Sequence, residues 1–267
     1  MGPSAAWVDA FADRPFSGNP AAVVRLEQPA SDRAMQDLAR EFGLSETAYL
    51  LPEGDDWRLR WFTPSVEVDL CGHATLASAW VLTEMGLAPA DAPITFHTRS
   101  GPLGARRRGE WVELDFPACP TTPTDAPPNL AEALGAWPLA CHVAGEDLMV
   151  ELASEAEVER LAPDLAALAT IPVRGVIVTA RSAGPADFAS RFFGPRVGIP
   201  EDPVTGSAHC ALAPFWAARL GRTGLTGVQR SARGGTVRVR VEGDRVRLAG
   251  RVVTIWQGEL AAALESR

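Results

Sequence analysis

Two segments of the chain, about half its length apart, share one pattern: Asp69-Leu70-Cys71-Gly72-His73-Ala74-Thr75 and Pro203-Val204-Thr205-Gly206-Ser207-Ala208. In each, a polar loop ends at a glycine, and a run of small apolar residues typical of a buried helix follows. A glycine at a helix start exposes backbone N–H groups and the positive end of the helix dipole, which favours an anion. We therefore expect two helix starts that face each other and hold a small carboxylate between two half-domains.

The composition excludes several classes of function. The 267 residues carry a net charge of −8, and 46% of them are hydrophobic, which suffices for one large or two small domains. The acidic balance argues against nucleic acid and membrane surfaces as partners. All 25 basic residues are arginine, so lysine Schiff-base and P-loop chemistry are excluded. The amino terminus shows no leader pattern, and we expect a cytoplasmic protein with free thiols.

Apolar periodicity and turn residues predict two halves joined by a proline-rich linker over 117–128. In the first half we expect helices over 31–42 and 72–85 and strands near 7–11, 21–24, 47–51, 58–62, 94, 103 and 111–116. In the second half we expect helices over 130–134, 154–168 and 206–220 and strands near 142, 149, 173–179, 188–193, 237–241 and 245–255. The helices that begin at Gly72 and Gly206 are apolar on nearly every face, which indicates burial.

These elements predict an α/β (α+β) fold of two similar halves. Each half is expected to be a curled, mostly antiparallel sheet around a central helix. The predicted domains are 1–117 and 118–267, with the last residues able to pack back on the first half.

Glu46 is the one charged residue in the stretch Leu44-Ser45-Glu46-Thr47-Ala48-Tyr49-Leu50. Charged side chains are mostly exposed, so the residue pattern alone favours a surface glutamate. If Glu46 is buried, the penalty on its charged form makes it a competent general acid or base. His73 and Asp202 also have structural alternatives, as a hydrogen-bonded histidine and as a turn or N-cap aspartate.

Cys71 offers a different chemistry. At a helix start it would be a thiol base or nucleophile of lowered pKa, and otherwise it is a small buried residue. Aligning Gly72 with Gly206 places Thr205, not a second cysteine, opposite Cys71, which favours the packing role. No spacing of His, Cys, Asp and Glu matches a metal motif.

Four motifs follow one another over nearly the whole chain: Ser17-Gly18-Asn19-Pro20, Leu44-Ser45-Glu46-Thr47, Cys71-Gly72-His73-Ala74-Thr75 and Glu201-Asp202-Pro203-Val204-Thr205-Gly206-Ser207-Ala208. Together they resemble the PhzF-like isomerases of phenazine biosynthesis, which are relatives of diaminopimelate epimerase. The resemblance implies an active site in the cleft between the two halves, a homodimer, and neither a metal nor an organic cofactor.

The resemblance also implies a reaction and its residues. The reaction is a proton shift of the kind that isomerises trans-2,3-dihydro-3-hydroxyanthranilate, with Glu46 as general acid and base and with His73 and Asp202 assisting. Binding of the small carboxylated substrate is assigned to Asn19, Gly72, Thr205, Gly206 and Ser207. Two alternatives remain open, a Cys71-dependent amino-acid racemase or epimerase and a non-catalytic binder of small carboxylates.

Overall fold

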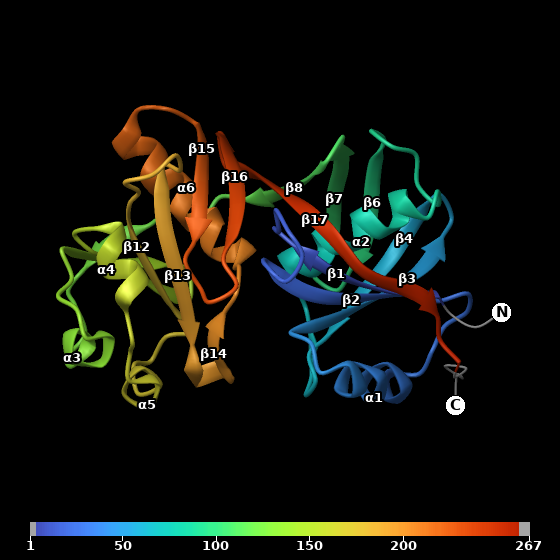
Figure 1. Ribbon diagram of the computed structural model, residues 1–267, viewed down its shortest axis with the longest axis horizontal. Coiled ribbons are helices and arrows are strands. Elements are labelled where there is room, and N and C mark those ends of the chain that lie inside the picture. The colour runs from blue at the N-terminus through green and yellow to red at the C-terminus, as the bar shows by residue number, and fades with distance from the viewer. Residues whose placement is uncertain (1–3, 262–267) are drawn as a thin grey trace. The chain divides into compact units, whose positions relative to one another are not determined.

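The computed structural model describes residues 4–261 of the chain. Their contacts divide into two units (Figure 1). Unit 1 consists of the residues up to Asp115 together with those from Ala249 onward, and unit 2 is Phe116–Leu248. The chain passes between the units within two strands, β8 (Trp111–Pro117) and β17 (Arg245–Glu259). Each unit is a mixed α+β structure in which strands predominate.

Unit 1 is organised around a curled sheet. Besides parts of β8 and β17, its strands are β1 (Ser4–Ala10), β2 (Asn19–Arg25), β3 (Glu46–Glu53), β4 (Asp56–Phe62), β5 (Glu67–Val68), β6 (Pro93–Thr98) and β7 (Gly101–Arg108). The pairs β2–β3 and β4–β6 are parallel, whereas β1–β2, β1–β17, β3–β4, β4–β5, β6–β7 and β7–β8 are antiparallel. Because β17 also pairs with β8, the order β1-β2-β3-β4-β6-β7-β8-β17 returns to β1.

Two helices cover the two faces of this sheet (Figure 1). Helix α2 (Gly72–Glu84) contacts β1, β2, β3 and β7, and it is buried on nearly every face, as its apolar sequence predicts. Helix α1 (Asp32–Phe42) packs Met35 and Ala39 against strand residues on the other face. Ser31 caps the start of α1, and Gly43, with φ of 61°, ends it.

Unit 2 contains a second sheet. Besides the start of β17, its strands are β9 (Thr122–Thr124), β10 (Ala140–Ala144), β11 (Asp147–Glu151), β12 (Val176–Arg181), β13 (Phe188–Gly194), β14 (Ile199–Asp202), β15 (Gly224–Gln229) and β16 (Gly235–Glu242). They pair in the order β9-β10-β11-β12-β13-β15-β16, and β14 pairs with β13. The pairs β11–β12 and β13–β15 are parallel, and the others are antiparallel.

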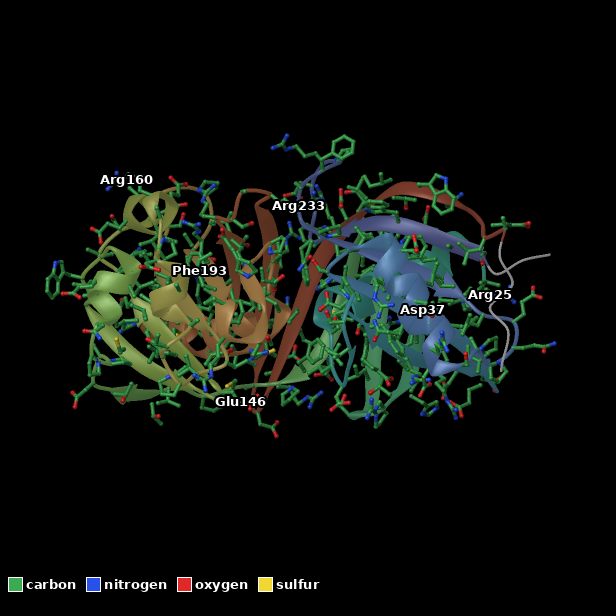
Figure 2. All side chains as sticks on the ribbon, turned by 90° about the horizontal axis from the view of Figure 1, so that it is seen from below. Arg25, Asp37, Glu146, Arg160, Phe193 and Arg233 are labelled. Atoms are coloured by element: carbon green, nitrogen blue, oxygen red, sulfur yellow. The ribbon has the colours of Figure 1, made fainter. Side chains whose placement is uncertain are left out.

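The helices of unit 2 are α3 (Leu130–Leu134), α4 (Glu155–Arg160), α5 (Leu165–Leu168) and α6 (Gly206–Leu220), with a 3₁₀ turn, η1 (Pro195–Val197). Helix α6 contacts β15 and β16 and is buried on most of its surface. A core that includes Leu134, Val158 and Phe193 joins α3, α4 and α5 to the strands. Figure 2 shows Phe193 inside this unit and Arg160 and Glu146 at its outer surface.

A proline inside α6 fixes the start of unit 2. Pro214 has no N–H group to donate to the carbonyl of Cys210, four residues earlier. The backbone N–H of Cys119 donates to that carbonyl instead, at 3.0 Å. A buried carbonyl that a helix leaves without its donor needs another one, and the proline-rich segment supplies it.

The structure differs from the sequence-based prediction in several elements. The helical pattern over 154–168 forms two short helices, α4 and α5, because Pro163 cannot continue a helix and restricts the residue before it. Asp164 then caps α5, accepting from the N–H groups of Ala166 and Ala167 at 3.0 Å. Strands β5, β9, β14 and β15 were not predicted, and β9 lies inside the proline-rich stretch.

Among residues 4–261, no helix combines the length and apolarity needed to cross a membrane.

Candidate active site

In unit 1 the predicted site residues lie together at the start of α2. We call Asn19, Glu46, Cys71, Gly72 and His73 the α2 cluster. Asn19 begins β2 and Glu46 begins β3, and these parallel strands are in register with Ala21 beside Glu46. Cys71 is the N-cap of α2, so Gly72 and His73 form its first turn.

Glu46 and His73 form the central contact of the α2 cluster. Glu46 Oε2 lies 3.1 Å from His73 Nε2, and the two side chains are only 14% and 7% exposed. Glu46 is therefore not the surface glutamate that the residue pattern alone favours. Within residues 4–261, neither of these buried atoms has an aligned hydrogen-bond partner. Poorly aligned contacts of this kind are common in active sites without their substrates, because alignment comes with the bound molecule.

The other ring nitrogen of His73 faces two different side chains. Nδ1 lies 3.2 Å from Asn19 Nδ2 and 3.5 Å from Cys71 Sγ. When the ring is neutral, the Asn19 amide donates to Nδ1, and the ring proton sits on Nε2, towards Glu46. Asn19, which was predicted to bind substrate, is fully buried and contacts His73.

The charges of the α2 cluster shift two pKa values. Burial lowers the pKa of His73, but Cys71, once its thiol is ionised, and the Glu46 carboxylate raise it by more, so the net shift is well upward. Burial and the Glu46 carboxylate raise the pKa of Cys71. The thiol therefore stays protonated near neutral pH, and Glu46 supplies the negative charge beside the ring. The lowered thiol pKa that a helix start could provide is not found here, because burial and the Glu46 carboxylate outweigh the lowering effects of His73 and the Ala74 N–H group.

In unit 2 the predicted residues gather at the start of α6. We call Asp202, Thr205, Gly206, Ser207 and Gln229 the α6 cluster; Gln229 was not predicted. Asp202 ends β14, Thr205 is the N-cap of α6, and Gln229 ends β15. The Thr205 hydroxyl donates to Asp202 Oδ2 at 2.6 Å. Since β15 itself was missed, no signal in the sequence placed Gln229 at this loop.

Ser207 has a neighbour that sequence reasoning also missed. Arg174 donates to Ser207 Oγ at 3.3 Å and is itself held by Asp147, with Nε 2.9 Å from Oδ1. A guanidinium group can only donate hydrogen bonds, so Ser207 Oγ is the acceptor in this contact. The Ser207 hydroxyl proton is thereby left to point elsewhere.

The starts of α2 and α6 differ from those of three shorter helices. Ser31, Ser154 and Asp164 accept backbone N–H bonds at the starts of α1, α4 and α5. Within the described part of the chain, Cys71 and Thr205 provide no such side-chain cap to α2 and α6, and neither does Asn129 to the five-residue helix α3. An uncapped first turn keeps N–H donors and the positive dipole end accessible to an anionic ligand.

One group of side chains has the composition of a metal site. The potential ligand atoms of Glu46, Cys71 and His73 all lie within 4.8 Å of one another. The same atoms already make the contacts described above, and burial favours the protonated thiol. A metal would have to displace that proton before the sulfur could bind it.

The comparisons with known proteins identify the family. The family model described as phenazine biosynthesis-like protein matches residues 8–258. The chain belongs to this phenazine biosynthesis-like family. It is 51% identical to an uncharacterized isomerase of Pseudomonas aeruginosa over 253 residues, which cover 95% of this chain and 96% of the relative. The resemblance read from the four motifs is thereby confirmed.

Solved structures agree with this assignment. A PhzF family protein of Enterococcus faecalis superposes with a TM-score of 0.95 and 41% sequence identity, over 98% of this chain and all of the other. A hydroxyproline epimerase of Agrobacterium vitis shares the fold, with a TM-score of 0.63 and 14% identity over 97% of this chain and 90% of the other. The phenazine biosynthesis-like fold is thus shared with epimerases.

Proposed function

We propose that this chain is a cofactor-independent isomerase that moves a proton between carbon atoms of a small carboxylated substrate. The observation that carries the proposal is the buried contact between Glu46 Oε2 and His73 Nε2, with both atoms lacking an aligned hydrogen bond within the described residues. Glu46 is the general acid and base. This class of reaction is supported by the family to which the chain belongs, since a relative that is 51% identical is named an isomerase.

The mechanism follows from the chemistry of a carbon-bound proton. Such a proton leaves slowly, so the base must be shielded from water and correctly placed. Glu46 takes the proton from one carbon and returns it to another on the same face, so a second base is unnecessary. General base catalysis of this type contributes about 10²–10⁴-fold in rate. Donors aimed at the developing enolate-like charge supply the remainder.

The other predicted residues receive supporting roles. His73 donates from Nε2 to Glu46 or to the substrate, and Asn19 acts through His73. The uncapped first turns at Gly72 and at Gly206-Ser207 bind the carboxylate through their N–H groups, and Asp202, oriented by Thr205, binds the substrate's amine or hydroxyl group.

The test uses solvent deuterium. Wild-type protein in D₂O is expected to incorporate deuterium into trans-2,3-dihydro-3-hydroxyanthranilate or into another member of a panel of small cyclic carboxylates. Glu46→Gln should abolish this incorporation while remaining folded at the temperature of the assay. Glu53→Gln is the matched control, because Glu53 lies at the far end of the same strand and pairs with Arg58 at the surface. Exchange that persists in Glu46→Gln removes Glu46 from the mechanism.

A second candidate function uses the thiol. The 3.5 Å separation of Cys71 Sγ and His73 Nδ1 is that of a thiol with an adjacent base, as a Cys71-dependent racemase would need. The raised pKa of Cys71 disfavours this reading. We expect Cys71→Ala to keep deuterium incorporation within about tenfold of wild type, because the protonated thiol takes no part in the proton transfer. Loss of a general base would instead cost about 10²–10⁴-fold. Full loss in Cys71→Ala with retention in Glu46→Gln would favour the racemase.

A non-catalytic binder of small carboxylates is the third candidate. It shares the uncapped helix starts with the isomerase but needs no proton transfer. Calorimetry with the same panel of carboxylates separates the two. Binding without deuterium incorporation in any member would favour the binder.

A further inference from the structure

Gln229 is buried beside the loop that joins the end of β14, at Asp202, to the start of α6, at Thr205. Its side chain is 1% exposed, and it lies at the end of β15. The backbone N–H of Thr205 donates to Gln229 Oε1 at 2.9 Å, and Gln229 Nε2 donates to the carbonyl of Asp202 at 2.7 Å. A backbone N–H can only donate and a carbonyl can only accept, so these two bonds fix which end of the amide is which.

The fixed amide sets the direction of a third hydrogen bond. Gln229 Nε2 also lies 3.3 Å from Thr205 Oγ1, and it can only donate there. The hydroxyl proton of Thr205 must therefore point away from Gln229. It points to Asp202 Oδ2, 2.6 Å distant.

The resulting chain of donors runs one way, from the Gln229 amide to the Thr205 hydroxyl to the Asp202 carboxylate. The last step has the length of an O–H bond to a charged oxygen, which is shorter and stronger than a bond between neutral groups. Donors in series also polarise one another, so each strengthens the next. Asp202 is thus held as an acceptor, with Oδ2 committed to Thr205. The charge of Arg174 also acts on Asp202, and it is the same in every variant described below.

We propose that Gln229 is a positioning residue that acts through Thr205 to hold Asp202 in its accepting, ionised form and in one orientation. This inference rests on the proposed function only in giving Asp202 a role in substrate binding. The donor chain can be tested without any turnover.

A purely structural Gln229 would brace the same loop without influencing the carboxylate. The two roles differ in one respect. A brace affects stability alone, whereas a positioning residue changes the proton affinity of Asp202, and it does so only while the Thr205 hydroxyl is present.

The experiment measures the titration of Asp202 by ¹³C NMR of its side-chain carboxyl group, assigned with Asp202→Asn. The variants are Gln229→Met, which keeps the length of the side chain but removes its donors and acceptor, Thr205→Val, which removes the hydroxyl, and the double variant. Gln36→Met is the matched control, because Gln36 Nε2 donates at 2.8 Å to the Thr63 carbonyl in unit 1. If Gln229→Met does not fold, Gln229→Asn takes its place in the experiment, because it keeps the amide group but shortens the side chain by one methylene.

We expect Thr205→Val to raise the proton affinity of Asp202 about tenfold, because an ionised carboxylate loses a donor. Gln229→Met should shift the midpoint in the same direction, and adding it to Thr205→Val should shift it no further. Thr205→Ser should restore the wild-type midpoint, and Gln36→Met should not change it. A Gln229→Met midpoint equal to wild type, or one whose shift adds fully to that of Thr205→Val, overturns the proposal.

Failure of the proposed function leaves a different result. If no substrate exchanges deuterium in the wild-type protein but the two variants remain non-additive at Asp202, the donor chain stands and the isomerase does not. If exchange occurs and Gln229→Met lowers kcat with little change in KM while the Asp202 midpoint stays fixed, the isomerase stands and the donor chain does not.

Discussion

His73 Nε2 lies 3.1 Å from Glu46 Oε2, and His73 Nδ1 lies 3.2 Å from Asn19 Nδ2. The two ring nitrogens thus face groups of opposite character, a carboxylate on one side and an amide on the other. This difference assigns the proton of the neutral ring to the side of the carboxylate. It also makes the protonation of His73 depend on Glu46.

The first prediction concerns the pH dependence of stability. The pKa of His73 is raised in the folded chain above its ordinary value of 6.5, so its contribution to stability is fully present below about pH 6.5. This contribution is lost as the pH rises from 6.5 through the raised pKa of the folded chain. Between these two pKa values the loss is about 1.4 kcal/mol per pH unit. We expect Glu46→Gln to lose less stability than wild type on going from pH 6.5 to pH 9, measured by urea unfolding.

Cys71→Ala distinguishes the source of the charge. Because the pKa of Cys71 is raised, its thiol is neutral over most of this range. Cys71→Ala should therefore follow the wild-type pH dependence. If Cys71→Ala flattens the curve and Glu46→Gln does not, a thiolate and not the carboxylate holds the proton on His73.

The chemistry-bearing parts of the chain were predictable, because they sit on strong local signals. Glycines mark the starts of α2 and α6, and apolar runs without a polar face predict buried helices, which the structure contains. The burial of Glu46 was not predictable, because it depends on β2 and α2 packing beside β3. Periodicity reports neighbours along one element and not those across a sheet.

The missed residues share a cause. Gln229 ends a strand rich in glycine and polar residues, Gly224–Gln229, whose pairing with β13 and β16 overrides its weak local preference. Arg174 lies outside every helix and strand, and its contact with Ser207 comes from a distant part of the chain. Such long-range partners leave no pattern in a single sequence.

The second prediction concerns the turn before Asn19. Gly18 has φ of +66°, and a Cβ there would lie 2.2 Å from the carbonyl oxygen of Ala10. Gly54 has nearly the same φ, +65°, and a Cβ there would meet nothing within 4 Å, so Gly54 is the matched control. Gly54→Ala should cost about 1 kcal/mol, the ordinary cost of a left-handed backbone for a residue with a side chain. Gly18→Ala should cost at least about 3 kcal/mol, because the backbone must also shift.

The displaced turn should also reach the α2 cluster, because Asn19 follows Gly18 directly. We expect Gly18→Ala to reduce deuterium incorporation more than its stability predicts at a temperature where it remains folded. Equal unfolding free energies for the two alanine variants would contradict the close approach at Gly18.

The third prediction concerns the support of Asp202. Arg191, only 9% exposed, donates to the carbonyls of Val158 and Leu161 and pairs with Glu201, the residue before Asp202. Arg191→Met leaves these acceptors and the carboxylate of Glu201 without their donor. We expect it to cost about 3 kcal/mol in urea unfolding, as the breaking of a buried pair does. Arg58→Met, which breaks the exposed pair with Glu53, should cost less than about 1 kcal/mol. Similar losses in both variants would show that burial does not strengthen the Arg191 contacts.

The fourth prediction concerns His209, in the first turns of α6, whose pKa shifts in the direction opposite to that of His73. The ring is fully buried, Nδ1 donates to the Thr205 carbonyl at 2.8 Å, and burial lowers the pKa to about 4. The unfolded chain takes up a proton at this histidine below about pH 6.5, whereas the folded chain does so only near pH 4. Stability is therefore lost as the pH falls between these values, by about 3 kcal/mol in all.

His209→Asn removes the titrating group and keeps an N–H near the Thr205 carbonyl. Its unfolding free energy should fall less steeply than that of wild type between pH 6.5 and pH 4, so that the two curves converge towards low pH. His97→Asn is the control, because His97 is exposed and pairs with Asp56 at the surface. Parallel curves for wild type and His209→Asn would mean that burial does not lower the pKa of His209 and that the ring is protonated inside the fold. Both N–H groups of the ring would then need acceptors, and the Thr205 carbonyl could serve only one of them.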